Sequence, residues 1–403
     1  MPIGQDYRCF VDCSPMGPTS LTDFYALDDL LSNEERLLRD TIRRFVDDKW
    51  MPIVADHFDA GTFPMDLVPQ IADLGLLGIH LDGYGCAGAS ATAYGIACRE
   101  LERGDSGLRS FVSVQGSLCM FPIWKFGSEE QKQEWLPRMA AGEIIGCFGL
   151  TEPDHGSDPG SMTTRARKDG DDWILNGAKR WITNAGIAHV AIVWAQTDEG
   201  IRGFIVPTDT PGFEARKIEK KLSLRASVTG EFYLDDVRIP ESFRLPEAVG
   251  MKGPLSCLSE ARYGIVWGAV GAGMACLEAA RDYATGREQF GKPIAGFQIT
   301  QAKLAEMLTD MTNASLQAFR LGQLKELGRC EPAHVSMAKR HNVRAAIDTA
   351  RTARTILGAN GISLEYPVIR HMVNLESVLT YEGTEEIHTL VLGETATGVA
   401  AYR

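Results

Sequence analysis

The chain has 403 residues, a net charge of −12, 44% hydrophobic residues and 23% charged residues. At ~150 residues per domain this length predicts two or three domains. The balanced composition excludes a disordered chain, a collagen-like repeat and a multi-span membrane protein. The acidic surplus argues against nucleic acid as a partner, because it repels a polyphosphate backbone. Since no run of ~18 apolar residues is present, we expect no membrane partner.

The nine cysteines are scattered without a C-x-x-C pair, and Cys9 and Cys13 lack downstream partners at metal-ligand spacing. We therefore expect free thiols in a reducing compartment and no metal site. Arg8 is the only basic residue before Arg36, and several aspartates surround it. This pattern is unlike a mitochondrial or secretory presequence, so we expect a cytoplasmic protein.

After an N-terminal extension, residues 1–24, the region 25–143 is predicted to form a helical domain. Ser32 and Glu35 form the pattern of a capping box, and Pro52 ends the helix that follows. Further helices are predicted at Pro64–Gly78, Thr92–Glu102 and Glu129–Met139, the last closed by Pro137 and Gly142.

Residues 144–246 are predicted to form a β-domain. Short apolar or β-branched runs recur there, and Asn176-Gly177 predicts a hairpin between Trp173–Leu175 and Arg180–Thr183. The other predicted strands are Ile144–Phe148, His189–Ala195, Gly203–Val206, Phe232–Leu234 and Val237–Ile239.

Residues 247–403 return to long helices, which gives the order helix, sheet, helix and predicts an α+β fold. Four glycines punctuate one of these helices, and we interpret them as positions where a neighbouring helix packs closely: Gly264, Gly268, Gly271 and Gly273.

The segment Gly83–Gly88 matches the pattern G-x-G-x-x-G of dinucleotide-binding loops. Such a fingerprint requires a preceding strand and an acidic residue at the end of the next strand. Here Glu100 and Glu102 fall inside a predicted helix, so we interpret the segment as a glycine-rich turn between helices.

Three other segments each allow two interpretations. Thr151–Asp158 offers N–H groups and hydroxyls suited to a pyrophosphate, or forms a solvated turn. Trp181–Asn184 places an aromatic ring and a hydroxyl at a strand end, or forms a half-buried strand. Arg287–Gly291 lies between two helices, where it could hold a phosphate and a ring or make a helix-end contact.

The segment Tyr381–Thr384 precedes a short helix for which Thr384 is a good N-cap. Glu382 is either one more acidic residue near the positive end of that helix or a general base on a loop that glycine makes flexible. Arg109, beside Ser110, either lies on the surface or selects an anionic substrate inside a pocket.

Taken together, these segments resemble, in order and spacing, the acyl-CoA dehydrogenase family, from about residue 25 to the C-terminus. The resemblance implies an N-terminal helical domain, a middle β-domain and a C-terminal four-helix bundle. It also implies non-covalent FAD near a subunit boundary, an acyl-CoA substrate, a homotetramer and electron transfer to electron-transfer flavoprotein.

Within the family, Asp105–Met162, Leu222–Ser227, Ala261–Gly264 and Asn374–Thr384 most resemble members that act on glutaryl-CoA. The implied reaction is oxidation and decarboxylation of glutaryl-CoA to crotonyl-CoA and CO2. One alternative is dehydrogenation of another short-chain or dicarboxylic-type acyl-CoA without decarboxylation. Another is a flavin- or CoA-binding protein without catalysis.

The resemblance also implies roles for single residues. Glu382 matches the catalytic base, and Arg109 with Ser110 matches the pair that receives the distal carboxylate of the substrate. The remaining substrate-binding residues are Tyr381, Glu102, Gly383, Ser157 and, in the segment Leu255–Arg262, the CoA-binding cation Arg262.

The FAD-binding residues implied by the resemblance come from five stretches of the chain, and Arg287 and Gln298 would reach the cofactor of a neighbouring subunit. They are Phe148, Leu150, Thr151, Gly156, Ser157, Trp181, Ile182, Thr183, Arg287, Phe290, Gln298, Thr355, Leu357, Gly358, Ala359, Thr384 and Glu386. The chain departs from the family pattern at Glu385, Glu386 and Glu394, which concern the outer FAD site or a subunit contact.

Overall fold

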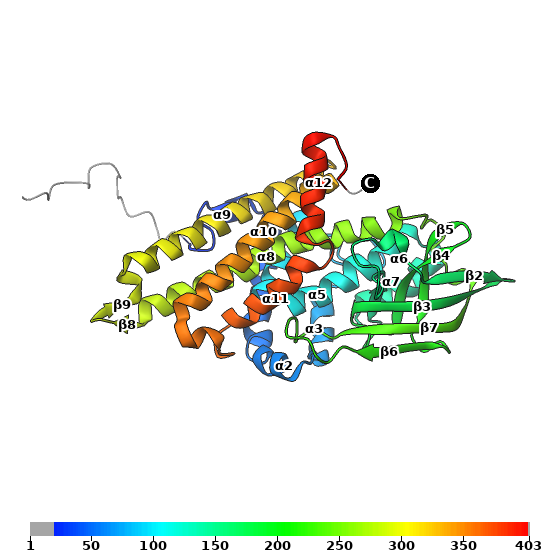
Figure 1. The fold of residues 1–403 in the computed structure, drawn as a ribbon, viewed down its shortest axis with the longest axis horizontal. Coiled ribbons are helices and arrows are strands. Elements are labelled where there is room, and N and C mark those ends of the chain that lie inside the picture. Colours follow the sequence, from blue (N-terminus) through cyan, green and yellow to red (C-terminus); the bar gives the residue numbers. More distant parts are fainter. Residues whose placement is uncertain (1–19, 402–403) are drawn as a thin grey trace, which may run out of the picture.

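The computed structural model describes residues 20–401. Most of the predicted extension 1–24 lies outside these residues, as do Arg8, Cys9 and Cys13. Figure 1 shows a body of helices with a β-sheet domain at one end, in the chain order helices, sheet, helices. This arrangement confirms the predicted α+β fold.

The described part of the N-terminal region contains seven α-helices. The predicted capping box is present, because the Ser32 side chain accepts from the Glu35 N–H and the Glu35 carboxylate accepts from the Ser32 N–H. The helices are α1 (Asn33–Phe45), α2 (Val54–Ala60), α3 (Val68–Asp73), α4 (Ala91–Gly104), α5 (Ser106–Ser113), α6 (Phe121–Phe126) and α7 (Glu129–Ala140), with π-helical segments Val46–Trp50 and Val114–Met120.

Two predictions in this region were inaccurate. Pro137 lies inside α7 and does not close it; the helix ends before Gly142, which has φ +73°. The prediction Pro64–Gly78 was too long, since the α-helix covers only α3. The glycine-rich segment Gly83–Gly88 is confirmed as a turn between helices, because residues 20–82 contain no strand.

The β-domain is one seven-stranded sheet in the order β1-β4-β2-β3-β7-β6, with β5 paired to β4. The pairs β1–β4 and β2–β4 are parallel and the others antiparallel. The strands are β1 (Gly146–Gly149), β2 (Arg165–Asp169), β3 (Asp172–Thr183), β4 (Val190–Thr197), β5 (Gly200–Pro207), β6 (Phe213–Lys217) and β7 (Thr229–Pro240).

The hairpin predicted at Asn176-Gly177 was wrong, because both residues lie inside the continuous strand β3. They form a bulge in its pairing with β7. The Asn176 side chain donates to the Asp236 carboxylate and accepts from the Asp236 N–H, each at 2.9 Å. A Cβ on Gly177 would lie 2.5 Å from the Thr164 hydroxyl, so close approach of β2 explains this glycine.

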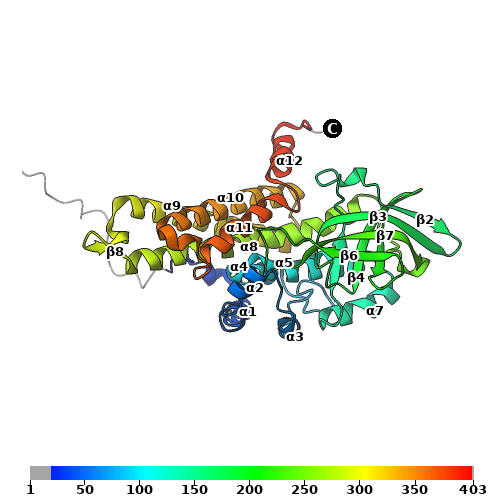
Figure 2. The same ribbon diagram turned by 60° about the horizontal axis from the view of Figure 1, so that its bottom comes forward.

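The C-terminal region contains the helices α8 (Lys252–Gly286), α9 (Gln298–Glu326), α10 (Pro332–Leu357), α11 (Val368–Thr380) and α12 (Glu385–Thr397), with a small hairpin of β8 (Glu288–Gln289) and β9 (Lys292–Pro293) after α8. The long helices α8, α9, α10 and α11 pack on one another as the predicted four-helix bundle. Figure 2 shows α12 projecting away from that bundle, in contact with α10.

The glycines of α8 confirm the prediction of close helix packing. A Cβ on Gly271 would lie 1.9 Å from the Arg99 carbonyl of α4, and one on Gly268 would lie 1.9 Å from the Glu102 carboxylate. Among the described helices, α8 alone is long and apolar enough to cross a membrane, and 89% of its apolar window is buried in the protein. That burial is typical of a core helix.

Candidate active site

The site is built around the short loop between α11 and α12. Tyr381 ends α11, and the Thr384 hydroxyl caps α12 by accepting from the Ile387 N–H at 3.3 Å. Between them Glu382 has φ +54° and Gly383 φ +91°. A non-glycine residue rarely adopts a positive φ, so the loop holds Glu382 in a strained conformation of the kind found at functional sites.

The Glu382 carboxyl lies in a buried, incompletely paired environment. Its Oε2 atom is buried and has no hydrogen-bond partner among the described residues. Burial raises the pKa of Glu382 above its ordinary value, and the charges of Arg109, Lys339 and Arg262 oppose that shift only in part. A carboxylate with a raised pKa and a free oxygen has the properties of a general base.

Arg109 lies beside this carboxyl and is 1% exposed, which excludes a surface position. Its Nε donates to the Glu102 carboxylate at 2.6 Å, and its Nη2 donates to the Tyr381 hydroxyl. The Ser110 hydroxyl lies 3.4 Å from the same Tyr381 oxygen. Burial raises the pKa of Tyr381 to about 12, so the phenol is neutral. The structure thus brings four of the predicted substrate-binding residues together with Glu382. They are Glu102, Arg109, Ser110 and Tyr381.

Arg262 contacts the backbone of the loop, where its Nε donates to the Glu382 carbonyl at 2.7 Å. In this arrangement the guanidinium holds the loop Tyr381–Thr384, hereafter the base loop. Gly383 is required beside it, because a Cβ there would lie 3.0 Å from His388 Nε2 and 3.3 Å from Arg262 Nη2. The predicted role of Arg262 toward CoA stays a prediction.

Sequence reasoning missed Lys339 of α10, which is 1% exposed. Its ammonium donates to the carbonyls of Tyr381 and Gly383, the latter at 2.6 Å, and lies 3.5 Å from the Glu382 carbonyl. One signal was present in the sequence: Val335 and Val343, four residues to either side, are apolar and share the helix face of Lys339.

The predicted FAD-binding residues of the β-domain gather at one end of β1 and β3. Phe148, Leu150 and Ile182 are buried, whereas Gly156 and Ser157 are exposed.

At the same edge Trp181 is 56% exposed and has φ +62°. Among the described residues, the hydroxyls of Thr151, Ser157 and Thr183 have no protein partner. An exposed ring and unpartnered hydroxyls fit a group that is both aromatic and rich in oxygen, as FAD is.

The loop after β1 is held by Glu152, whose carboxylate is fully used inside the protein. It accepts from the Lys179 ammonium and the Thr164 N–H, each at 2.9 Å, and from the Thr163 N–H at 2.6 Å. Burial alone would raise the pKa of Glu152, but hydrogen bonds from Thr164 and Thr163 and the Lys179 charge lower it to about 2. Glu152 therefore fixes the loop and has no free oxygen for chemistry.

Most of the remaining predicted FAD-binding residues gather at the other end of the helical bundle. Arg287 and Phe290 lie in the β8–β9 hairpin, and Phe290 is 95% exposed. Asn360, next to Ala359, donates to the Tyr283 hydroxyl near the end of α8. Gln298 begins α9 at the same end, and Thr355, Leu357 and Gly358 end α10 there (Figure 1).

This second group lies far from the base loop of the same chain. Arg262 and Arg287 are 25 positions apart along α8, which corresponds to ~37 Å at 1.5 Å per helical residue. Thr384 and Glu386, at the start of α12, stay with the base loop. The predicted FAD-binding residues of the base loop and those at the β8–β9 end therefore form two separate groups in one chain.

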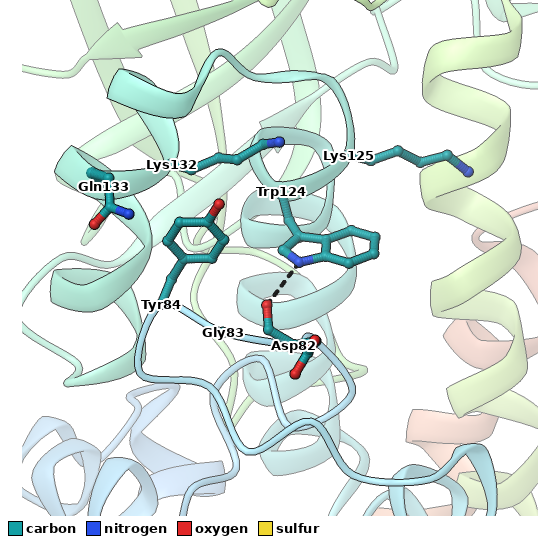
Figure 3. A pocket seen from close by; sticks show the side chains of 7 residues that line it. All are labelled: Asp82, Gly83, Tyr84, Trp124, Lys125, Lys132 and Gln133. Atoms are coloured by element: carbon teal, nitrogen blue, oxygen red, sulfur yellow. Dashed lines mark hydrogen bonds between the residues drawn. The ribbon is translucent and has the colours of Figure 1, made fainter.

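A surface cavity of about 670 Å³ lies elsewhere, over the turn Gly83–Gly88 (Figure 3). It is lined by Asp82, Gly83, Tyr84, Trp124, Lys125, Lys132 and Gln133, and the Trp124 ring N–H donates to the Asp82 carbonyl at 3.0 Å. None of the base-loop residues lines it. Within residues 20–401, no three His, Cys, Asp or Glu side chains are grouped to hold a metal ion.

Comparison with protein families gives three matches along the chain. Residues 32–143 match the acyl-CoA dehydrogenase N-terminal domain, residues 147–237 the middle domain and residues 249–397 the C-terminal domain.

Among curated proteins, the human mitochondrial short-chain specific acyl-CoA dehydrogenase is 39% identical over 369 residues, which cover 90% of each chain. Among solved structures, a glutaryl-CoA dehydrogenase from Mycobacterium smegmatis is 59% identical, with a TM-score of 0.93 over 95% of this chain and 99% of that one. A structure of a glutaryl-CoA dehydrogenase from Mycobacterium smegmatis in complex with FADH2 is 57% identical, with a TM-score of 0.94 and the same coverage. The chain therefore belongs to the acyl-CoA dehydrogenase family and is an oxidoreductase that acts on CH–CH bonds.

Proposed function

We propose that this enzyme oxidises and decarboxylates glutaryl-CoA to crotonyl-CoA and CO2 and passes the electrons to electron-transfer flavoprotein. The observation that carries the proposal is the buried Arg109 guanidinium beside the base, already oriented by Glu102 and Tyr381. An enzyme for a neutral acyl chain has no need of a guanidinium at this depth, because burying a charge costs free energy.

The charges around the loop also support a dicarboxylic substrate. Among residues 20–401, Arg109, Arg262 and Lys339 face two carboxylates, those of Glu102 and Glu382. If Glu382 takes up a proton from the substrate, one carboxylate is left against three basic side chains. A second substrate carboxylate reduces this imbalance, and the planar Arg109 guanidinium suits such a group geometrically.

FAD is the cofactor, and bound at this site it would supply the hydride acceptor for oxidation at the substrate β-carbon. The chain's own task is to remove the α-proton, which Glu382 does with its free oxygen. Because a thioester α-proton is weakly acidic, the enolate oxygen needs donors as it forms. The Glu382 N–H has no partner among the described residues, and the family resemblance assigns it this role.

Decarboxylation follows from the position of the second carboxylate. Dehydrogenation of glutaryl-CoA gives glutaconyl-CoA, from which loss of CO2 leaves a thioester-stabilised dienolate. Glu382, now protonated, returns its proton to the terminal carbon and gives crotonyl-CoA. Arg109 holds the carboxylate before it leaves.

The two separated groups of predicted FAD-binding residues support a further part of the proposal, a homotetramer in which a neighbouring subunit completes each FAD site. The domain boundaries after residues 24, 143 and 246 also stay predictions. Seven described cysteines are free thiols, which supports a reducing, cytoplasmic environment.

The main alternative is a dehydrogenase for another short-chain acyl-CoA that does not decarboxylate, and the names of the curated relatives favour it. A substrate panel distinguishes the two: turnover of butyryl-CoA above that of glutaryl-CoA would support the alternative. A flavin- or CoA-binding protein without catalysis would reduce no acceptor with any thioester.

The proposal is tested by incubating the FAD-loaded enzyme with glutaryl-CoA and an artificial electron acceptor. We expect crotonyl-CoA and CO2 in equal amounts. Glutaconyl-CoA that accumulates without CO2 would contradict decarboxylation and leave only the dehydrogenase activity.

A further inference from the structure

Three consecutive backbone carbonyls of the base loop converge on one side chain, that of Lys339. The ammonium donates to the Tyr381 and Gly383 carbonyls and lies at the limit of hydrogen bonding, 3.5 Å, from the Glu382 carbonyl. Lys339 comes from α10, whereas the loop joins α11 to α12. The contact therefore fixes the loop against a separate, rigid element.

Because the peptide bond is planar, this contact also fixes the direction of the Glu382 N–H. The Tyr381 carbonyl and the Glu382 N–H belong to one trans peptide unit, in which the two groups point in opposite directions. Since the carbonyl points at Lys339, the Glu382 N–H points away from it. That N–H, like those of Gly383 and Thr384, donates to no protein group among the described residues.

Burying a lysine costs free energy, which its hydrogen bonds must offset. The side chain is 1% exposed, and removing an ammonium from water is unfavourable unless it is hydrogen-bonded. The ammonium has three N–H donors, which matches the three carbonyls. The positive φ of Glu382 is strained, and conformations of this kind persist only where the surroundings impose them.

We propose that Lys339 is a positioning residue, which holds the three loop carbonyls on one side so that the Glu382 N–H faces the substrate thioester oxygen. This inference rests on the proposed function, since it needs a thioester bound beside Glu382. Lys339 acts through the loop and does not touch the substrate.

Lys339 also affects the proton affinity of the base. The charged and titratable groups around it are Glu382 and Tyr381 in the loop, Arg262 of α8, Arg109 of α5, Glu102 of α4 and His388 of α12. The Lys339 charge lowers the pKa of Glu382 against the effect of burial. Without that charge the pKa rises further, so the acid limb of kcat/KM moves to higher pH.

The test is infrared spectroscopy of crotonyl-CoA labelled with 13C at the thioester carbonyl and bound to the FAD-loaded enzyme. Hydrogen bonds to this carbonyl lower its stretching frequency on binding. We expect Lys339→Met to lose at least half of the wild-type shift. Because loss of one donor to a developing oxyanion costs roughly 10²–10³ in kcat, misalignment should cost about 10-fold or more, with KM nearly unchanged. Lys339→Gln keeps two N–H donors without the charge and should recover part of the frequency shift.

The chain offers a matched control in Lys221, a largely buried lysine whose ammonium donates to the carbonyls of Ser223, Leu224 and Ser227. Lys221→Met should lower thermal stability without changing the carbonyl frequency or the acid limb. If the wild type itself shows no shift, the proposed function fails.

If the wild type and both Lys339 variants show the same shift, the positioning role alone is contradicted. Failure of both Lys339 variants to fold, while Lys221→Met folds, would assign Lys339 to folding and also overturn the proposal.

Discussion

Two carboxylates, that of the buried Glu152 in the β-domain and that of the partly exposed Glu382 in the base loop, each lie near a buried lysine, yet they differ in how they are paired. Both Glu152 oxygens accept hydrogen bonds, from Lys179, Thr163 and Thr164. The Glu382 Oε2 atom has no partner among residues 20–401. The pKa of Glu152 falls to about 2, whereas that of Glu382 rises.

The position of the neighbouring lysine explains the difference. Lys179 donates directly to the Glu152 carboxylate, at 2.9 Å. Lys339 instead donates to the backbone carbonyls around Glu382 and leaves the carboxyl free. A buried carboxylate whose bonds are complete stabilises structure, whereas one whose backbone is fixed and whose oxygen is free can move a proton.

Glu382→Gln should produce the largest change in activity. The substitution keeps the shape of the side chain but removes the base, and general-base catalysis typically contributes about 10²–10⁴ to the rate. We expect kcat to fall by about 10³ or more, measured with glutaryl-CoA and an artificial acceptor, while FAD content and Tm stay near wild type. A kcat within about 10-fold of wild type would exclude Glu382 as the base.

Glu152→Gln should produce the opposite outcome. It leaves the buried Lys179 ammonium without its carboxylate, and breaking a buried ion pair typically costs about 3–5 kcal/mol of unfolding free energy. We expect a large loss of stability in denaturant titration, with kcat of the folded, FAD-loaded fraction within a few-fold of wild type. Unchanged stability together with a large loss of kcat would remove the distinction between the two carboxylates.

Arg109→Ala should change selectivity. Arg109 is the cation that we assign to the distal carboxylate, so kcat/KM for glutaryl-CoA should fall about 10²-fold more than that for butyryl-CoA, as for the loss of a buried charge-assisted contact worth about 2–3 kcal/mol. Steady-state kinetics on both thioesters measure the ratio. Equal losses on the two substrates would eliminate selection of the anion by Arg109.

A smaller effect concerns His80, whose ring stacks on Tyr94 and whose two buried ring nitrogens have no partner among the described residues. Burial lowers the pKa of His80 to about 4 from its usual 6.5. Between these values the unfolded chain binds a proton that the folded chain does not, so this histidine makes stability fall as the pH drops from 6.5 toward 4.

Replacing His80 by Phe removes the imidazole that binds a proton in the unfolded chain. The slope of the unfolding free energy against pH, measured by denaturant titration between pH 6 and 5, should decrease by up to about 1.4 kcal/mol per pH unit. The same slope in the variant and the wild type would show that His80 does not contribute to the acid sensitivity.

The sequence was sufficient for features that are local. The predicted N-cap at Thr384, the capping box at Ser32 and the turn at Gly83–Gly88 depend on residues a few positions apart, and the structure confirms them. The close packing of another helix on α8 could also be predicted, because glycines at helical spacing leave room for it; the structure shows that this helix is α4.

Features that depend on residues far apart in the chain could not be predicted from the local sequence. Asn176-Gly177 has the composition of a turn, but pairing with Asp236 and the approach of Thr164 keep it inside a strand. Lys339 lies 43 positions before Glu382, and nothing adjacent to it in sequence indicates that it meets the loop. The helix α5 was not predicted; it spans only eight residues, and all of them are buried, Arg109 and the serines included.

The most direct test of the proposed function is one anaerobic mixing experiment with the FAD-loaded enzyme and glutaryl-CoA that carries 13C in its distal carboxylate. We predict loss of the yellow flavin colour and release of crotonyl-CoA and labelled CO2 in equal amounts, identified by mass. Flavin colour that is bleached by butyryl-CoA but not by glutaryl-CoA would contradict the proposal.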